Sequence, residues 1–378
     1  MPAKGAEIGV VGAGAAGLGI AWKLAERGYT VLLLEAREPG SGAMTASGGM
    51  LSPAYEAEYE EIPLLQAFLH SRRLYPAWAE ALGDIGYTAC GTYELALTPE
   101  DVPYVRRRWE FERAQGIEVE WLEGAALRRH LPSISPRIPA GTYAPDEGQV
   151  LPERLRDRLV EAIQRHRGTI LSHTPVQRIS YAAQAFHLHT YHQTYTVETL
   201  IVCTGVPLEG LSLPFKVYPI RGQMIAVESP HPNWLSAPVR YFNKMTGYGY
   251  TIPKGSYLIL GGTAEEKGYD TSLTVGGVLD ILRRAYYVFP DLYEQRILRF
   301  WAGLRPATAE RRPVFWKVRG LPLYYVNGLY RNGILLLPLV AEGVAAWVAE
   351  GTVHPLLAPF TREVEEGSLA LSSAPPAP

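Results

Sequence analysis

Three glycines near the start of the chain have a spacing that serves nucleotide binding, in the pattern Gly12-x-Gly14-x-x-Gly17. The first glycine permits a tight turn, the second lets the backbone approach a pyrophosphate, and the third lets a helix pack against a strand. Glu35 follows 18 residues after Gly17, where a carboxylate can accept hydrogen bonds from ribose hydroxyls. We therefore predict a dinucleotide site, although such turns also serve packing alone and the pattern does not distinguish FAD from NAD.

A strand, a helix and a second strand must position this turn. Residues 6–11 are a short apolar run with β-branched members, which is typical of a buried parallel strand. We expect a helix over about 15–27, closed by Gly28, and a second buried strand over 30–35. The N-terminus of that helix would supply free N–H groups and a positive dipole end to the phosphates. This order of elements opens a doubly wound α/β fold.

The rest of the chain alternates between helical and strand patterns before its texture changes. We predict helices over residues 60–84, 100–115, 153–166, 275–288 and 341–350, and strands over 92–97, 169–171 and 199–203. Between about 217 and 264 the residues alternate and are rich in tyrosine, which indicates an antiparallel sheet. The length of 378 residues suggests two interleaved domains.

Composition excludes several classes of function. A net charge of -2 gives no basis for a nucleic-acid or acidic-membrane partner. The two cysteines provide neither a disulfide framework nor a metal site, and the nine histidines have no ligand-like spacing, so we expect no metal. No apolar segment reaches the roughly 18 residues that cross a bilayer. We expect a cytoplasmic protein.

Further segments resemble, in the expected order, the D-amino-acid oxidase superfamily of flavoproteins, and within it the glycine oxidases of the thiazole branch of thiamine biosynthesis. They are residues 43–51, 145–150, 173–176, 202–205, 219–223, 250–254, 261–265, 300–308 and 330–336. The last of these, Tyr-Arg-Asn-Gly-Ile-Leu-Leu, is the most specific to the glycine oxidases. The resemblance implies a two-domain α/β flavoprotein with a doubly wound (Rossmann-like) FAD-binding domain. It also implies an α+β substrate domain with a mainly antiparallel sheet.

The same resemblance implies a discontinuous domain organisation. We assign residues 1–85, 145–215 and 305–370 to the FAD-binding domain, and 86–144 and 216–304 to the substrate-binding domain. Residues 371–378, which are mostly proline, alanine and serine, are expected to form a disordered tail.

The resemblance also assigns residues to FAD. Besides the glycine turn and Glu35, the residues expected against the cofactor are Ala15, Ala16, Ala36, Ala43, Met44, Gly48, Gly49, Met50, Val176, Thr204, Gly205, Leu329, Tyr330, Arg331, Asn332, Gly333, Ile334 and Leu335. Small side chains at 43–50 suit a backbone pressed against a flat ring system, although a flexible loop would have a similar composition. Neither cysteine lies near Arg305, where sarcosine oxidases attach their flavin, so we expect non-covalent FAD.

Five residues are candidates for the chemistry itself, again by resemblance. A guanidinium offers a planar fork for bidentate carboxylate binding, and Arg305 is our first choice for the substrate carboxylate. Tyr250 would lend its hydroxyl to the same carboxylate, and Met50 would cap a small pocket. Arg331 would contribute positive charge and its backbone near the flavin, where charge stabilises the anionic reduced form. Tyr248 occupies the place where a glycine oxidase commonly has histidine.

Two more departures bear on the substrate. Ala264 replaces a larger apolar residue, and Leu329 stands where histidine is frequent. Because Ala264 enlarges the expected pocket, sarcosine and D-alanine compete with glycine as predicted substrates. The predicted reaction is oxidation of the C–N bond of a small amino acid, with glycine giving glyoxylate, ammonia and hydrogen peroxide through an imine.

Several alternatives stay open from sequence. Molecular oxygen is the expected electron acceptor, but a quinone-linked dehydrogenase of the same superfamily would have the same motifs. A sarcosine or D-amino-acid oxidase is a second alternative, and a tRNA wobble-uridine oxidase module is disfavoured by the neutral charge. A non-catalytic FAD-binding redox or sensor module is the alternative outside the enzymes, and a simple NAD-dependent dehydrogenase would not need the flavin-facing segments. We also expect a functional link to thiazole synthase and a homo-oligomer, because relatives often form tetramers.

Overall fold

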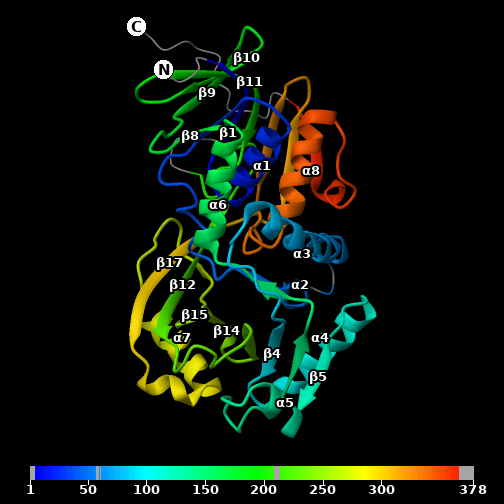
Figure 1. Cartoon of the computed structure of the whole chain (residues 1–378), viewed down its shortest axis with the longest axis vertical. Helices are drawn as coiled ribbons and strands as arrows, with labels where there is room; N and C mark the ends of the chain where they lie inside the picture. Colours follow the sequence, from blue (N-terminus) through cyan, green and yellow to red (C-terminus); the bar gives the residue numbers. More distant parts are fainter. Residues whose placement is uncertain (1–4, 57–58, 60, 208–212, 366–378) are drawn as a thin grey trace.

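The computed structural model describes residues 5–56, 59, 61–207 and 213–365, so the predicted disordered tail lies outside the described residues. Within them the chain forms two nine-stranded sheets and a two-stranded one, and the two large sheets occupy opposite ends of the molecule (Figure 1). The two-stranded sheet joins β3 (Met50–Leu51) to β7 (Gly148–Gln149).

The first large sheet has a parallel centre in the order β19-β11-β1-β2-β8. Its strands are β1 (Gly5–Val11), β2 (Val31–Leu34), β8 (Thr169–Leu171), β9 (Arg178–Ala182), β10 (Ala185–His189), β11 (Thr194–Val202), β18 (Val314–Val318), β19 (Leu323–Asn327) and β20 (Thr361–Val364). Four helices pack on one face of it: α1 (Ala15–Glu26), α3 (Ile62–Leu82), α6 (Pro152–Arg165) and α8 (Leu337–Glu350). This parallel centre with its covering helices is the predicted Rossmann-like arrangement.

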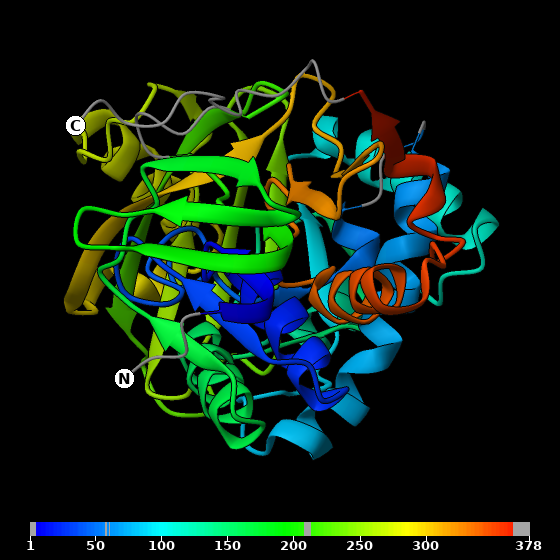
Figure 2. The ribbon, with the colours of Figure 1, turned by 90° about the horizontal axis from the view of Figure 1, so that it is seen from above.

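The other face of this sheet is covered by strands instead of helices. The antiparallel β9–β10–β11 meander packs Phe186 and Leu188 against Leu32 and Leu34 of β2. In Figure 2 the meander forms a green layer over the blue N-terminal elements. The sequence did not lead us to predict the β9–β10 hairpin. Its turn residues Ala183 and Gln184 both have positive φ angles. Turns of this kind are usually recognised by glycine or asparagine, and this turn has neither.

The second large sheet is mainly antiparallel, as the aromatic alternation predicted. Its strands are β4 (Thr92–Ala96), β5 (Glu120–Glu123), β6 (Ala140–Ala144), β12 (Tyr218–Glu228), β13 (Val239–Asn243), β14 (Gly247–Pro253), β15 (Tyr257–Gly261), β16 (Glu265–Glu266) and β17 (Ile297–Ala307). The helices of this half are α4 (Val102–Ala114), α5 (Gly124–His130) and α7 (Val275–Val288). The first sheet takes residues from three separate stretches of the chain, and the second from the two between them.

Short elements complete the chain. They are α2 (Pro53–Glu56) and the 3-10 helices η1 (Pro99–Asp101), η2 (Pro290–Glu294) and η3 (Ala358–Phe360). Helix α8 begins at Leu337, four residues before the predicted start, because Pro338 lies in its first turn, where a missing N–H loses no helical hydrogen bond. No helix in the described ranges is long and apolar enough to span a membrane.

Candidate active site

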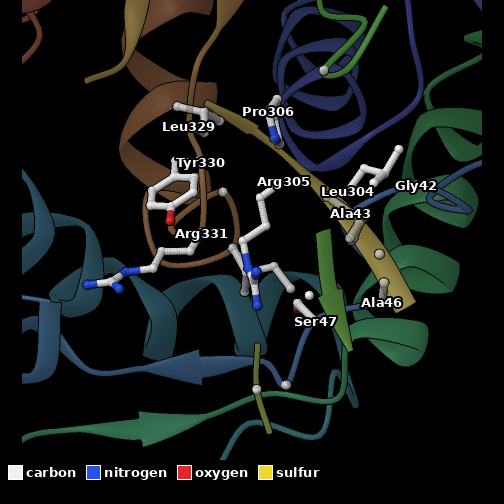
Figure 3. Close-up of a pocket in the computed structure, with 18 of the residues that line it drawn as sticks. Gly42, Ala43, Ala46, Ser47, Leu304, Arg305, Pro306, Leu329, Tyr330 and Arg331 are labelled. Carbon is white, nitrogen blue, oxygen red and sulfur yellow. The ribbon is translucent and has the colours of Figure 1, made fainter. Parts of the chain in front are cut away.

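A cavity of about 1190 Å³ lies between the two large sheets. Its walls come from segments far apart in the chain: the glycine turn, residues 43–50, the end of β17 and residues 329–334. Figure 3 shows Ala43, Ala46 and Ser47 on one side of this space and Leu329 and Tyr330 on the other, with Arg305 between them. The fold therefore brings together the N-terminal and C-terminal motifs.

The three glycines of the turn have different surroundings. A Cβ on Gly12, whose φ is +102°, would lie 2.6 Å from the carbonyl oxygen of Cys203, and one on Gly17 would lie 1.9 Å from the carbonyl oxygen of Gly12. By contrast, a Cβ on Gly14 would meet no heavy atom within 4 Å. The first and third glycines are therefore required by packing. The second exposes backbone to the cavity at the N-terminus of α1, where an anionic ligand is favoured.

Glu35 lies beside this turn, at the end of β2. Its carboxylate accepts hydrogen bonds from the backbone N–H groups of Ala13 at 2.7 Å and Arg37 at 3.0 Å, and it lines the cavity. Thr204 lies just after the end of β11 and lines the cavity. Its hydroxyl oxygen is buried and has no hydrogen-bond partner among the described residues. A buried polar atom without a partner at a cavity wall is consistent with a polar ligand atom there. These residues fit a dinucleotide such as FAD.

Residues 43–50 are held by contacts with the second large sheet and with Val150. A Cβ on Gly48 would lie 2.3 Å from Ile252 Cδ1, and one on Gly49 would lie 2.3 Å from the carbonyl oxygen of Val150. The indole N–H of Trp301 donates to the carbonyl oxygen of Ala46 at 3.1 Å. The small residues here are therefore required by close packing, and the alternative of a flexible surface loop is not what the structure has.

Arg305 enters the cavity from β17. Its side chain crosses Gly222, where an added Cβ would lie only 2.2 Å from Arg305 Nη2. Its guanidinium donates to the carbonyl oxygen of Thr263 at 3.0 Å and forms no ion pair with any acid in the described part of the chain. A cation without an acid partner at a cavity wall can bind a carboxylate ligand.

Tyr250 lies beside Arg305, and its ring, like the Arg305 side chain, lies directly over a glycine. A Cβ on Gly261 would lie 2.3 Å from the Tyr250 ring, so this glycine lets the ring lie flat on the sheet. Burial raises the pKa of the Tyr250 phenol, while the Arg305 guanidinium opposes that rise. The hydroxyl therefore stays protonated at neutral pH and can donate a hydrogen bond.

Arg331 lines the cavity, but its charge is balanced. Its Nε donates to the Glu56 carboxylate at 2.5 Å, and Figure 3 shows the side chains of Arg331 and Arg305 pointing in different directions. Burial would lower the pKa of Arg331, but Glu56 and Tyr55 outweigh this and raise it. The net positive charge at this point is smaller than the sequence suggested, because the Glu56 carboxylate pairs with Arg331.

Sequence reasoning also missed the support beneath Tyr248. The guanidinium carbon of Arg240 lies 3.7 Å from the ring centre of Tyr248 and 3.9 Å from that of Tyr55. Arg240 is paired with Glu94 at 3.4 Å, and the Tyr248 hydroxyl is hydrogen-bonded to that of Tyr104. Such stacking fixes the rings that line the cavity. The sequence offers no signal for it, because the participants lie on five separate elements.

The predicted site residues, taken together, divide into those that line the cavity and those that do not. Those that line the cavity are Gly12, Gly14, Ala15, Ala16, Glu35, Ala43, Met44, Gly48, Gly49, Met50, Thr204, Gly205, Tyr248, Tyr250, Arg305, Leu329, Tyr330, Arg331, Asn332, Gly333 and Ile334. Gly17, Ala36, Val176 and Leu335 are not among its lining residues. Gly17 acts through the turn, and Leu335 is part of the core beneath α8.

Glu147 should make the stability of the fold depend on pH. It is buried, accepts a hydrogen bond from the Ala54 N–H at 2.5 Å, and burial raises its pKa to about 8. Between pH 4.5 and about 8, the folded state therefore holds a proton that the unfolded state has lost. The Glu147 contribution to stability falls across that window by about 1.4 kcal/mol per pH unit.

The prediction is tested with Glu147→Gln, which keeps the acceptor for Ala54 and cannot ionise. Urea unfolding at pH 5 and pH 8 should show the variant gaining stability relative to the unsubstituted protein as pH rises. An unchanged difference between the two proteins at both pH values would contradict the assignment.

Comparisons with known proteins agree with this geometry. Residues 7–347 match the family described as FAD dependent oxidoreductase. The chain is 32% identical to glycine oxidase of Geobacillus kaustophilus, over 94% of this chain and 96% of that protein. It is 26% identical to glycine oxidase of Bacillus subtilis, over 88% and 90%. It is also 30% identical to the bifunctional protein ThiO/ThiG of Trichormus variabilis, over 94% of this chain and 54% of that protein.

The three-dimensional comparison agrees with the sequence relatives. The crystal structure of glycine oxidase from Geobacillus kaustophilus superposes with a TM-score of 0.88 at 30% identity, covering 98% of this chain and 100% of that one. Family, fold and the cavity between the sheets therefore point in one direction. The chain belongs to the D-amino-acid oxidase family of FAD-dependent oxidoreductases and is an FAD-dependent amino-acid oxidase.

Proposed function

We propose that this enzyme oxidises glycine to glyoxylate and ammonia, with oxygen as the electron acceptor. The observation that carries the proposal is the Arg305 guanidinium, which lies in the cavity beside Tyr250 and has no acid partner among the described residues. The names of several relatives support both the substrate and a role in thiamine biosynthesis. A functional link to a thiazole synthase is part of the proposal.

The chain's own residues bind and orient the substrate. The Arg305 fork binds the carboxylate, and the Tyr250 hydroxyl donates a hydrogen bond to it. A nearby guanidinium disfavours the ammonium form of the substrate, so the amine loses a proton to solvent more readily. FAD bound in this cavity would supply the hydride acceptor for oxidation at Cα. Water then hydrolyses the imine to glyoxylate and ammonia.

The cofactor would be held without a covalent bond by the groups described above. The N-terminus of α1 would bind the pyrophosphate, and residues 43–50 and 329–334, which line the cavity, would contact the ring system. Cys203 lines the cavity, but burial raises the pKa of its thiol, and an uncharged thiol is a poor nucleophile. Arg331 contributes mainly through its backbone, since Glu56 balances its charge.

Substituting Gly222 should weaken glycine binding without loss of FAD. In Gly222→Ala the new methyl group takes the space of Arg305 Nη2, so the guanidinium must move away from the carboxylate. Losing one charge-assisted hydrogen bond corresponds to roughly a 10- to 100-fold rise in KM for glycine. Steady-state kinetics and the flavin content of the purified variant measure both effects. An unchanged KM, or a loss of FAD in step with the rise in KM, would contradict the account.

Product analysis tests the reaction and separates it from its main alternative. Aerobic incubation with glycine should release glyoxylate, ammonia and hydrogen peroxide in equal amounts. Glyoxylate formed only when a quinone is added would favour a quinone-linked dehydrogenase. Faster turnover of sarcosine or D-alanine would move the assignment to those substrates, which Ala264 leaves room for. No oxidation of any small amino acid would overturn the proposal.

A further inference from the structure

Arg284 is a second arginine in the cavity that has no acid partner. It lies on α7 and is 8% exposed. Its Nη1 donates to the carbonyl oxygen of Thr246 at 2.8 Å and its Nη2 to that of Gly262 at 3.5 Å, while its Nε has no partner among the described residues. No carboxylate in the described ranges forms an ion pair with it. A buried cation balanced only by carbonyl dipoles is costly unless a ligand anion completes it.

The other buried arginines of this half of the molecule are paired. Arg108 contacts Glu94 and Glu112, Arg221 contacts Glu265 and Asp270, and Arg240 contacts Glu94. These pairs show the usual arrangement of a structural arginine. Arg284 departs from it in the same way as Arg305, the residue proposed to bind the substrate carboxylate.

Arg284 and Arg305 are also close in the fold. Arg284 donates to the carbonyl oxygen of Gly262 and Arg305 to that of Thr263, the next residue. Both arginines line the same cavity. Ala264, the small residue that follows Gly262 and Thr263 in the chain, also lines it. A substrate that binds Arg305 at one end and extends past Ala264 can therefore reach the Arg284 guanidinium at its other end.

The acids near this part of the cavity do not neutralise it. Glu265 is occupied by Arg221 at 2.5 Å and by Gln223 at 2.7 Å. Asp280 lies one helical turn before Arg284 but is exposed and forms no ion pair with it within 4.0 Å. The two guanidinium groups thus leave an excess of positive charge, which favours a ligand with two negative groups.

We propose that Arg284 binds a second anionic group of the substrate. The preferred substrates would then be amino acids with two carboxylates, one on Arg305 and one on Arg284. The second carboxylate is carried either on the amine nitrogen, as in iminodiacetate, or on the side chain, as in D-aspartate. This inference rests on the proposed amine oxidation and narrows its substrate class, since glycine leaves Arg284 without an anion.

Two matched pairs of substrates test this in the unsubstituted holoenzyme. Iminodiacetate is sarcosine with a carboxylate added to the methyl carbon, and D-aspartate is D-alanine with the same addition. We expect kcat/KM to be about 10- to 100-fold higher for the dicarboxylate in at least one pair, as for a charge-assisted contact. The pair that shows the gain identifies where the second carboxylate is carried. No gain in either pair would overturn the proposal.

A variant assigns the gain to Arg284. Arg284→Gln keeps an amide donor for the carbonyl oxygens but removes the charge, and should abolish the preference while leaving kcat/KM for sarcosine and D-alanine within about threefold. Arg283→Gln is the control, because this neighbour on α7 is exposed and does not line the cavity. Equal losses for both members of a pair would mean that Arg284 is only structural. If the variant does not fold, the comparison of substrate pairs decides alone.

Binding of the ether analogue oxydiacetate separates this inference from the proposed function. It carries two carboxylates but no oxidisable amine, and its binding is read from the change in flavin absorption. Binding that weakens by at least about tenfold in Arg284→Gln and not in Arg283→Gln supports the second anion site, even if no amine is oxidised. Equal binding by both variants would refute the site, even if glycine is oxidised.

Discussion

Replacing Arg305 by alanine is expected to raise KM for glycine by about two to three orders of magnitude while FAD stays bound. The guanidinium lies beside Tyr250, donates to two backbone carbonyl oxygens and has no acid partner among the described residues, so its fork is available to a ligand carboxylate. Its removal leaves that carboxylate unpaired in a partly buried site. Steady-state kinetics give KM, and the absorption spectrum of the purified variant gives the flavin content.

The control for this substitution lies on the same strand. Arg299 is exposed on β17 and does not line the cavity, so Arg299→Ala removes an arginine from β17 at a distance from the site. Arg305→Lys keeps the charge without the planar fork and should fall between the two. Loss of flavin in step with loss of activity in Arg305→Ala would show that the arginine supports the fold instead of the substrate.

Substituting the second and third glycines of the turn should separate FAD binding from folding. In Gly14→Ala the added methyl group meets no heavy atom within 4 Å, so the apoprotein should keep its thermal stability. The methyl group would occupy the place of a pyrophosphate, and FAD affinity should fall by at least about 100-fold. Gly17→Ala instead puts a methyl carbon 1.9 Å from the carbonyl oxygen of Gly12. Relieving that clash costs about 1–3 kcal/mol or more of apoprotein stability.

Thermal unfolding of the apoproteins and FAD titration test this pair together. The expected pattern is a stable Gly14→Ala apoprotein with weak FAD binding, and a Gly17→Ala apoprotein with a lowered Tm. If Gly14→Ala binds FAD as tightly as the unsubstituted protein, the pyrophosphate does not lie at the N-terminus of α1. That outcome would leave the fold intact but move the cofactor.

The parts of the fold that were predictable have local causes. The turn at Gly12 to Gly17, the first two strands and the helix Val275–Val288 follow from glycine spacing and from apolar periodicity within short windows. Arg305 and Tyr250 were found because they lie in segments that resemble a known family. These signals are contained in a few consecutive residues, so they can be recognised without knowledge of the fold.

The parts that were missed depend on contacts between distant elements. Glu56 next to Arg331 and Arg240 between two tyrosines are pairs that only the tertiary structure creates. Nothing in the sequence distinguishes Gly222 from other strand glycines. Only the structure shows that a glycine is required there, because the Arg305 side chain crosses it. Arg284 gave no signal, because a helical arginine is expected to face solvent and this one is buried.

The most direct test of the whole account is reduction of the bound flavin by glycine without oxygen. The protein is reconstituted with FAD, made anaerobic and mixed with glycine, and the visible absorption of the flavin is followed. We predict that it bleaches, and that Arg305→Ala with bound FAD bleaches only at much higher glycine concentration. A protein that takes up no FAD, or whose FAD stays oxidised with glycine, sarcosine, D-alanine, D-proline and iminodiacetate alike, would contradict the account.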